Sequence, residues 1–209
     1  MKNIFKVAVL NIILVMGLAT HVCADLEVPG ESDPLLAETA FSQAGSDYSI
    51  VKEFRNSQVL LKVVRKDGKE MAVSPNLGEQ EKLFIFAGQT VSLKIADLDE
   101  DKVPEIICAA MTGPDRSSLY VFNFDQQKSK LVPLKFVYEK ENLIRDFLVS
   151  DLYQQDGQDL VFLDGNHIRV LGKIYQENAA PVVGFYFFEL VGKRYVCTKI
   201  IPVPQDDAN

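Results

Sequence analysis

The feature that most restricts the fold is a long succession of short strand-like runs separated by turn residues, which begins near residue 48 and continues almost to the C-terminus. The runs 59–64 and 71–73 flank Asp67-Gly68, a pair typical of a β-hairpin turn. Further strands are expected at 83–86, 90–95, 105–111, 118–124, 131–138, 143–150, 160–163, 167–171, 182–190 and 194–201. This spacing predicts an all-β domain of antiparallel hairpins over 48–203.

The first 24 residues have the order of a secretory signal peptide. Lys2 and Lys6 precede an apolar stretch over 7–19, and Val22-Cys23-Ala24 suits cleavage after Ala24. A membrane anchor is the alternative, but the apolar run is shorter than the ~20 residues that a spanning helix needs. The sequence therefore predicts an exported protein, periplasmic or extracellular, with no membrane span after cleavage.

The next segment, 25–47, is an acidic leader with no lysine or arginine. Asp33 suits a helix N-cap, Pro34 the first helical position and Gly45 the stop, so a short helix is one expectation. A disordered tether is the other. At the opposite end, 204–209 is expected to be a disordered tail.

The charge of the chain restricts its partners. Cleavage after Ala24 removes two lysines and no acid, so the mature chain is more negative than the full sequence, whose formal net charge is −7. This balance disfavours nucleic acid, which needs a basic surface. It suits a metal cation or a basic protein partner, although it also serves solubility alone.

Two cysteines, Cys108 and Cys197, remain outside the expected signal peptide. Export makes a disulfide chemically possible. Each cysteine lies in an expected strand, and the sequence does not show whether their Cα atoms come within the roughly 7 Å that a bridge requires. A disulfide and two separate thiols both stay open.

An internal repeat organises the second half of the chain. The segments 95–107 and 149–161 align without gaps, and both have the order strand, Asp-Leu, polar loop, acidic residue, strand. Their separation of roughly fifty residues falls in the range of β-propeller blades. The repeat units are expected at about 88–138 and 142–201.

The segment DLDEDKVPEII at 97–107, with its weaker copy DLYQQDGQDLV at 151–161, resembles the FG-GAP/VCBS repeat of β-propeller proteins. The resemblance implies a calcium-binding Asp-x-Asp-x-Asp loop between two strands. Propellers usually have at least four blades, for which this chain is too short. The expected fold is therefore a partial β-propeller or a sandwich with two blade-like repeats.

The chemistry of the first loop also points to calcium, which takes six to eight oxygen ligands at about 2.3–2.6 Å. Asp97, Asp99 and Asp101 occupy positions one, three and five of the loop. The carbonyl of Val103 and the carboxylate of Glu105 complete the predicted set. Without a cation these carboxylates repel one another. The alternative is an exposed acidic turn whose charges water screens.

Both loops depart from the family pattern. Lys102 stands where the family usually has glycine, and a positive φ is uncommon for a residue with a side chain. In the second loop Asp151 and Asp159 match the ends, but Tyr153 and Gln155 replace the inner acids. The second loop is expected to keep the turn and to lose the metal.

Catalysis is not expected, and the chain is predicted not to be an enzyme. His167 is the only histidine outside the expected signal peptide, so a site with several histidine ligands cannot be built. The sequence has neither a Gly-x-Ser-x-Gly elbow nor a glycine-rich phosphate loop. A carboxylate pair acting as acid and base remains a formal alternative.

The predicted function is an exported calcium-binding module whose stiffened loop positions a surface for an unknown protein partner. The aromatic run Phe185-Tyr186-Phe187-Phe188 alternates between the two faces of a strand, so half of it would be core and an exposed half would mark an interface. A structural envelope or matrix component is one alternative. An inhibitor of a cell-wall hydrolase is another, since small exported inhibitors with a hairpin and an acidic loop look similar.

Overall fold

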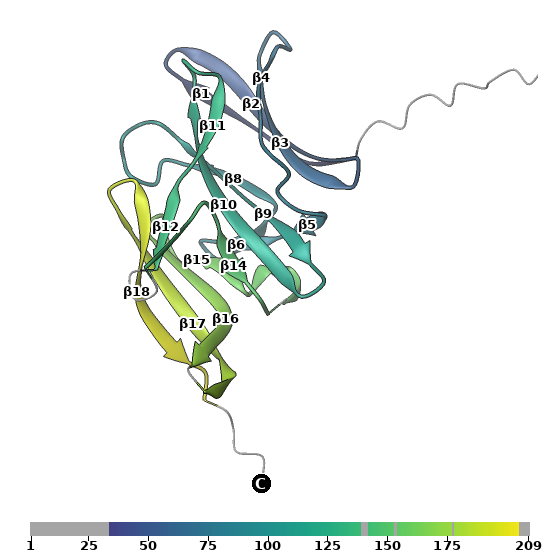
Figure 1. The fold of residues 1–209 in the computed structure, drawn as a ribbon. Helices are drawn as coiled ribbons and strands as arrows, with labels where there is room; N and C mark the ends of the chain where they lie inside the picture. The colour runs from purple at the N-terminus through teal and green to yellow at the C-terminus, as the bar shows by residue number, and fades with distance from the viewer. Residues whose placement is uncertain (1–33, 139–141, 153, 177, 205–209) are drawn as a thin grey trace, which may run out of the picture. The chain divides into compact units, whose positions relative to one another are not determined.

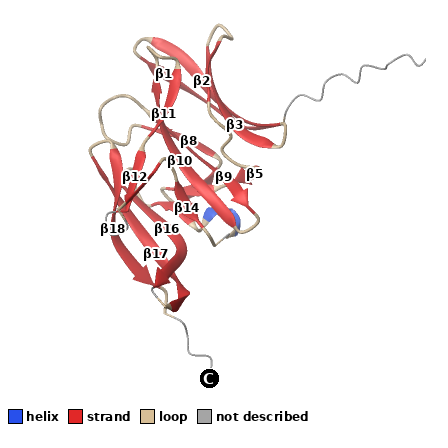
Figure 2. Cartoon of the chain, viewed as in Figure 1, coloured by secondary structure: helices blue, strands red, loops and turns tan. Residues whose placement is uncertain are grey.

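The structure, a computed structural model, describes residues 34–138, 142–152, 154–176 and 178–204 (Figure 1). Chain contacts separate Met1–Ser32 from Asp33–Asn209, and the fold below belongs to the second unit. The expected signal peptide and nearly all of the expected tail lie outside the described residues. Within the described ranges, regular structure is β-strand apart from a short 3₁₀ helix, η2 (Gln155–Gly157), which confirms the all-β class (Figure 2).

The first four strands form an antiparallel sheet in chain order. They are β1 (Leu35–Gln43), β2 (Ser46–Arg55), β3 (Gln58–Arg65) and β4 (Glu70–Val73). The hairpin predicted at Asp67-Gly68 is confirmed, because it joins β3 to β4 and Gly68 has a φ of 85°. Glycine adopts this left-handed conformation without the strain that a side chain brings.

Strand β1 corrects the expectation for the acidic leader 25–47, whose described part is neither helix nor tether. Leu35–Gln43 pairs with β2 along its length. Phe41 stacks on Tyr48 with ring centroids 5.3 Å apart, and both side chains are buried. Gly45 lies in the turn between β1 and β2 with a φ of 75°, so it closes a hairpin instead of ending a helix. Tertiary burial of the apolar face outweighs the local helix signals.

Six strands form a central antiparallel sheet of order β11-β10-β9-β5, with β14 added to β10 and β8 added to β9. They are β5 (Gln80–Lys82), β8 (Leu93–Ala96), β9 (Glu105–Gly113), β10 (Arg116–Asp125), β11 (Lys130–Pro133) and β14 (Leu148–Ser150). Strand β9 is buried continuously over 105–111. A strand with an uninterrupted buried run has both faces of its sheet covered.

Eight strands form the third sheet, of order β13-β12-β18-β17-β16-β15-β6-β7. They are β6 (Phe84–Phe86), β7 (Gln89–Val91), β12 (Lys135–Tyr138), β13 (Leu143–Arg145), β15 (Leu160–Phe162), β16 (His167–Gln176), β17 (Ala179–Val191) and β18 (Arg194–Pro202). The pairs β12–β18 and β15–β6 are parallel and the other pairs are antiparallel.

The central sheet has a core on each face because side chains alternate along its strands. On one face, Ile107 belongs to a buried cluster that includes Phe136 of the eight-stranded sheet. On the other face, Ile106 belongs to a cluster that includes Ile50 of the four-stranded sheet. The fold is therefore three sheets packed in layers, with β9 and β10 in the middle layer (Figure 1).

A fully buried lysine ties the four-stranded sheet to the central sheet. The Lys52 ammonium on β2 donates to the carbonyl of Ala109 on β9 at 2.7 Å and to the carbonyl of Ser92 at 3.1 Å. It also pairs with the Glu81 carboxylate of β5 at 2.8 Å. A charge without water needs this set of partners, since unpaired burial is costly.

The aromatic run of β17 alternates as predicted. Phe188 is buried and Tyr186 packs against the same core cluster. On the opposite face Phe185 and Phe187 are half-buried, with the Arg169 guanidinium 4.9 Å from the Phe185 ring centre. Half of the run is therefore core, and the other half forms part of the outer face of the sheet.

Cys108 and Cys197 are not joined by a disulfide. Cys108 lies in the core between the four-stranded and central sheets, whereas Cys197 packs against the core on the opposite face of the central sheet. Full burial raises the pKa of the Cys108 thiol to about 12. The two layers keep the thiols apart, and only Cys197 is partly exposed.

This arrangement predicts two very different thiol reactivities. In the chain without residues 1–24, we expect a thiol reagent to label Cys197 in the native state and Cys108 only after unfolding, because buried thiols react slowly. Titrating thiols with and without denaturant measures both. The variant Cys197→Ser is the control, and native labelling of that variant would contradict the buried position of Cys108.

The two repeated loops join strands in different ways. The first leads from β8 to β9, which are antiparallel neighbours in the central sheet. The second leads from β14 in the central sheet to β15 in the eight-stranded sheet. The same sequence order thus closes a hairpin in one case and connects two layers in the other.

Candidate metal centre

The first acidic loop is held by the register of the two strands that it joins. Ala96 at the end of β8 pairs with Glu105 at the start of β9. Asp97 therefore leaves β8 beside the point where Glu105 enters β9. The strand pairing therefore brings position one of the motif, Asp97, close to position nine, Glu105.

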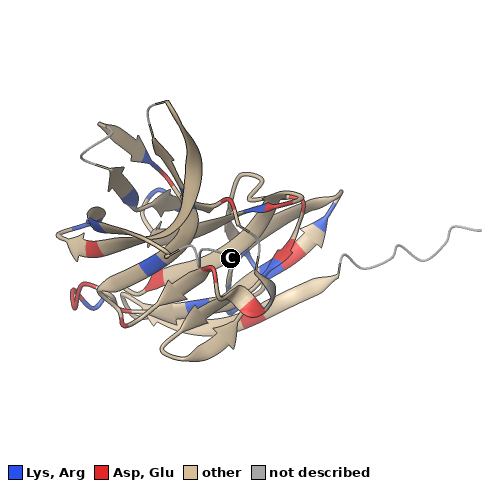
Figure 3. Cartoon of the chain, turned by 90° about the horizontal axis from the view of Figure 1, so that it is seen from below, with Lys and Arg blue, Asp and Glu red and all other residues tan. Residues whose placement is uncertain are grey.

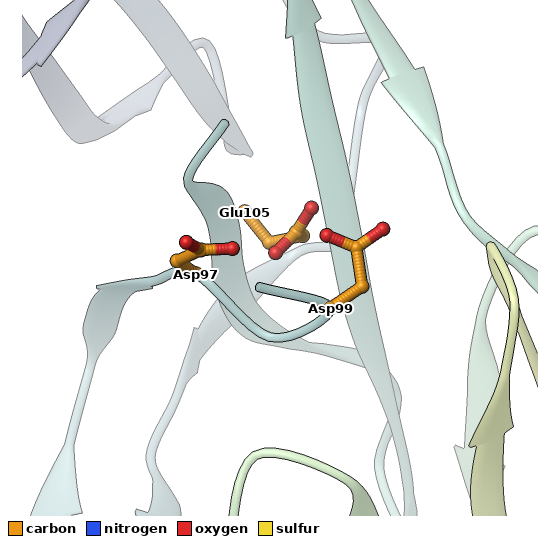
Figure 4. Close-up of side chains that lie close together, drawn as sticks. All are labelled: Asp97, Asp99 and Glu105. Atoms are coloured by element: carbon orange, nitrogen blue, oxygen red, sulfur yellow. The ribbon is translucent and has the colours of Figure 1, made fainter. Parts of the chain in front are cut away.

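Three of the predicted ligands come together. Asp97, Asp99 and Glu105 each offer a carboxylate oxygen, and these oxygens all lie within 4.8 Å of one another. Figure 4 shows the Glu105 carboxyl between those of the two aspartates in that view. Two ligands on opposite sides of a calcium ion lie up to about 5 Å apart, given Ca–O distances of about 2.3–2.6 Å. The spacing therefore fits a shared divalent ion.

The backbone of the loop bonds to its own carboxylates. The Lys102 N–H donates to Asp97 Oδ2 at 3.0 Å, and the Val103 N–H donates to Asp101 Oδ1 at 2.8 Å. Lys102 has a φ of 67°, the left-handed conformation that the usual glycine adopts easily. The lysine at position six therefore keeps the bend of the loop, at the cost of some backbone strain.

Glu105 forms the buried floor of the site, with 1% of its surface exposed. Its carboxylate accepts the Leu98 N–H at 2.7 Å and the Asn123 side-chain amide at 2.6 Å. Burial raises the pKa of Glu105 above its ordinary value, because the charged form loses its hydration. Neither of these two partners carries a positive charge, so a cation would compensate this carboxylate.

Sequence reasoning did not identify Asn123. It lies opposite Glu105 in the pairing of β10 with β9. A signal was present, because Asn123 is the one amide within the apolar run of β10, YVFNF. A polar side chain at the end of a buried strand needs a hydrogen-bond partner.

Asp101 is not part of the converging group. Its carboxylate pairs with the ammonium of Lys193 at 2.6 Å, and the same ammonium lies 3.9 Å from Asp99 Oδ2. The hydrogen bond with Lys193 lowers the pKa of Asp101, and Asp101 in turn raises the pKa of Lys193. Lys193 belongs to the turn between β17 and β18, far along the chain, and no local pattern could have indicated it.

In the second loop, both matching acids have partners within the protein. Asp159 is fully buried, pairs with the Lys82 ammonium at 2.6 Å and accepts the Ser117 hydroxyl at 2.9 Å. Asp151 accepts the Lys173 N–H at 2.6 Å and the Tyr175 hydroxyl at 3.1 Å. These acids have separate partners, and Lys82 supplies the positive charge at Asp159.

Within the described residues, neither the inner positions of the second loop nor the lone mature histidine adds a ligand to the converging group. Tyr153 and the side chain of Gln155 lie outside the described part of the chain. His167 is exposed and its ring bonds to the neighbouring Asp164 at 2.9 Å. Across the described ranges, Asp97, Asp99 and Glu105 are the one group with spacing suited to a metal ion.

Comparison with known proteins gave no match to a family model, to a curated protein or to a solved structure. In the part of the chain that the structure describes, no helix has the length and apolar character needed to cross a membrane.

Proposed function

We propose that this chain is an exported calcium-binding protein that acts as a protein-binding module in the cell envelope or outside the cell. The calcium part depends on one observation, the convergence of oxygens from Asp97, Asp99 and Glu105 within 4.8 Å. The buried charge of Glu105 supports it, because a divalent ion would offset both its desolvation and the repulsion between the carboxylates. The export part depends on the signal-like order of residues 1–24.

We also propose that the chain is related to FG-GAP/VCBS repeat proteins and that its fold is a partial propeller or a sandwich with two blade-like repeats. Two observations support it. The first loop closes a hairpin between β8 and β9, as expected of a calcium loop between strands. The sheets also pack face to face in layers, as neighbouring blades or sandwich halves do.

Exposed apolar side chains on terminal strands support a protein partner. Leu35 on β1 is 59% exposed and Ile144 on β13 is 62% exposed. Each of these strands ends its sheet. Terminal strands with free backbone groups and apolar side chains pair readily with another chain. The proposal assigns no catalysis.

Calcium binding is tested by calorimetry and thermal unfolding of the protein purified after export. We expect binding heat and a melting temperature that rises with calcium, because an ion at 100 times its Kd stabilises the folded state by about 2.7 kcal/mol. Asp99→Ala is expected to abolish both effects. Lys193→Gln is expected to tighten binding, because it removes a positive charge beside Asp99 and releases Asp101.

Asp115→Ala is the matched control, since Asp115 is an exposed acid in the turn between β9 and β10. It should bind calcium like the unchanged protein. Absence of binding heat together with an unchanged melting temperature would refute the calcium site. An unchanged response of Asp99→Ala would place the ion elsewhere.

The proposed binding of a protein partner needs a separate experiment. Affinity capture from envelope extract, with calcium or with a chelator, is expected to yield one stoichiometric protein only when calcium is present. Asp99→Ala should lose that protein under both conditions. A structural envelope component would instead give no stoichiometric partner, and that result would contradict the binding-module proposal.

A further inference from the structure

A second candidate site lies away from the calcium loop. A cavity of about 410 Å³ is lined by residues of β9, β10, β13, β14 and β16 and by the residues that flank β14, Phe147 and Asp151. It is placed where the central sheet meets the eight-stranded sheet. None of the three converging carboxylates of the calcium loop lines it. Its volume falls in the range of sites for small molecules.

Two arginines line this cavity. Arg116 begins β10 and is exposed, and Arg145 ends β13 with its guanidinium 5.9 Å from the Tyr138 ring centre. Among the described residues, no ion pair involves either side chain. A guanidinium presents a rigid fork of donors that matches a carboxylate or a phosphate.

The local charge differs from the charge of the chain as a whole. The full sequence has a formal net charge of −7, and in Figure 3 acidic and basic residues are interspersed along the strands. The cavity has two arginines and one acid, Asp151. Clefts with one excess sign of charge concentrate ligands of the opposite sign.

Asp151 has a structural task within the cavity. Its carboxylate accepts hydrogen bonds from the Lys173 backbone at 2.6 Å and from the Tyr175 hydroxyl at 3.1 Å. The second bond holds Tyr175, which is 69% exposed, at the cavity wall. A tyrosine held in this way offers a flat contact surface at a small entropic cost.

Two hydroxyl groups and two apolar side chains, Phe147 and Val149, complete the lining. Thr112 on β9 and Ser118 on β10 lie in the same cavity, and their hydroxyl oxygens are 3.2 Å apart. Hydroxyls donate and accept, so they suit the alcohol groups of a polar ring. The two guanidinium groups suit an anionic group, the tyrosine suits the face of a ring, and the hydroxyls suit alcohol groups. One ligand that carries all three features would fit this cavity.

We propose that this cavity binds a small sugar that carries an oxyanion. The carboxylate or phosphate is held by Arg116 and Arg145, and the ring packs against Tyr175. The Thr112 hydroxyl, held by the buried Ser118 hydroxyl, bonds to the hydroxyls of the sugar. The site is independent of the proposed calcium loop, so failure of one proposal leaves the other intact.

The test is calorimetric titration of the protein purified after export with glucuronate, glucose 6-phosphate and glucose. We expect at least one of the two charged sugars to bind and glucose to bind at least tenfold more weakly. Binding of glucuronate alone identifies a carboxylate ligand, and binding of glucose 6-phosphate alone identifies a phosphate ligand. Arg116→Gln and Arg145→Gln should each weaken binding about tenfold, the effect of one charge-assisted hydrogen bond.

The variant Asp151→Asn is expected to change the affinity for the charged sugar in the opposite direction. It removes the negative charge of the cavity while keeping a similar shape, so binding of the charged sugar should become several-fold tighter. Arg194→Gln, an exposed arginine at the start of β18, is the control that leaves affinity unchanged.

Three results would overturn the proposal. The first is no binding of either charged sugar at about 10 mM. The second is equal binding of glucose and the charged sugars. The third is unchanged affinity in Arg116→Gln, which is an exposed position where substitution does not threaten folding.

Discussion

Replacing Asp159 by alanine is expected to lower the free energy of unfolding by about 3–5 kcal/mol. The change removes the carboxylate that lies 2.6 Å from the Lys82 ammonium, of which 3% is exposed, and leaves neutral partners such as the Gln154 carbonyl at 2.7 Å. It also removes the acceptor of the buried Ser117 hydroxyl. Loss of the opposite charge beside a buried ammonium costs far more than the loss of a surface ion pair. Denaturant unfolding followed by circular dichroism measures the difference.

The control for this prediction is Asp67→Ala. Asp67 pairs with Arg65 at the surface at 2.5 Å, and solvent screens that pair. Its removal should leave stability almost unchanged. The double variant Lys82→Met with Asp159→Leu should be less destabilised than the sum of its single changes, because no unpaired charge remains. A small effect of Asp159→Ala, or strict additivity, would contradict the buried pair.

Replacing Gly157 by alanine is expected to destabilise the fold by about 3 kcal/mol or more, the sum of backbone strain and overpacking. Gly157 has a φ of 76°, which side chains disfavour. An added Cβ would also lie 2.5 Å from the Phe84 Cα and 2.7 Å from the Leu83 carbonyl oxygen. Both obstacles are backbone atoms, which cannot rotate away as a side chain does.

Gly192→Ala separates these two causes. Gly192 has a φ of 62°, but an added Cβ there meets nothing within 4 Å. It should show only the backbone strain, about 1 kcal/mol. Equal melting temperatures for Gly157→Ala and Gly192→Ala would show that Gly157 does not lie against the backbone of Leu83 and Phe84.

These two predictions concern the second loop, which differs from the first in what stabilises it. Glu105 and Asp159 occupy the same position of the repeat and both are buried. Asp159 has the charged partner Lys82, whereas Glu105 bonds to the Leu98 N–H and to Asn123. This contrast gives a physical reason to propose a metal ion at the first loop alone.

Much of the fold could be predicted from local pattern. The β-hairpin at Asp67-Gly68 and the alternation of the aromatic run in β17 are both found in the structure. These features depend on turn chemistry and on a two-residue period, which neighbouring residues determine. The leader is the exception, because the helix signals at Asp33 and Pro34 precede a segment that becomes β1 through its pairing with β2.

The candidate site was predictable only in part, for the same reason. Asp97, Asp99 and Glu105 are close in the sequence, so their spacing indicated that they would meet. Asp101 follows the same spacing, yet its carboxylate turns to Lys193. Sequence spacing restricts where a short loop can place its side chains, but it does not reveal a competing charge from a distant turn.

By itself, the sequence determined the β class, the hairpin turns and the acidic loop, because each depends on residues within a few positions of one another. Only the tertiary structure decided the division into three sheets, the burial of Lys52 and the lysine partners of Asp101 and Asp159. These outcomes depend on contacts between segments far apart in the chain. The free energy that a residue gains from burial or from charge pairing depends on these distant contacts, which form only when the strands pack together.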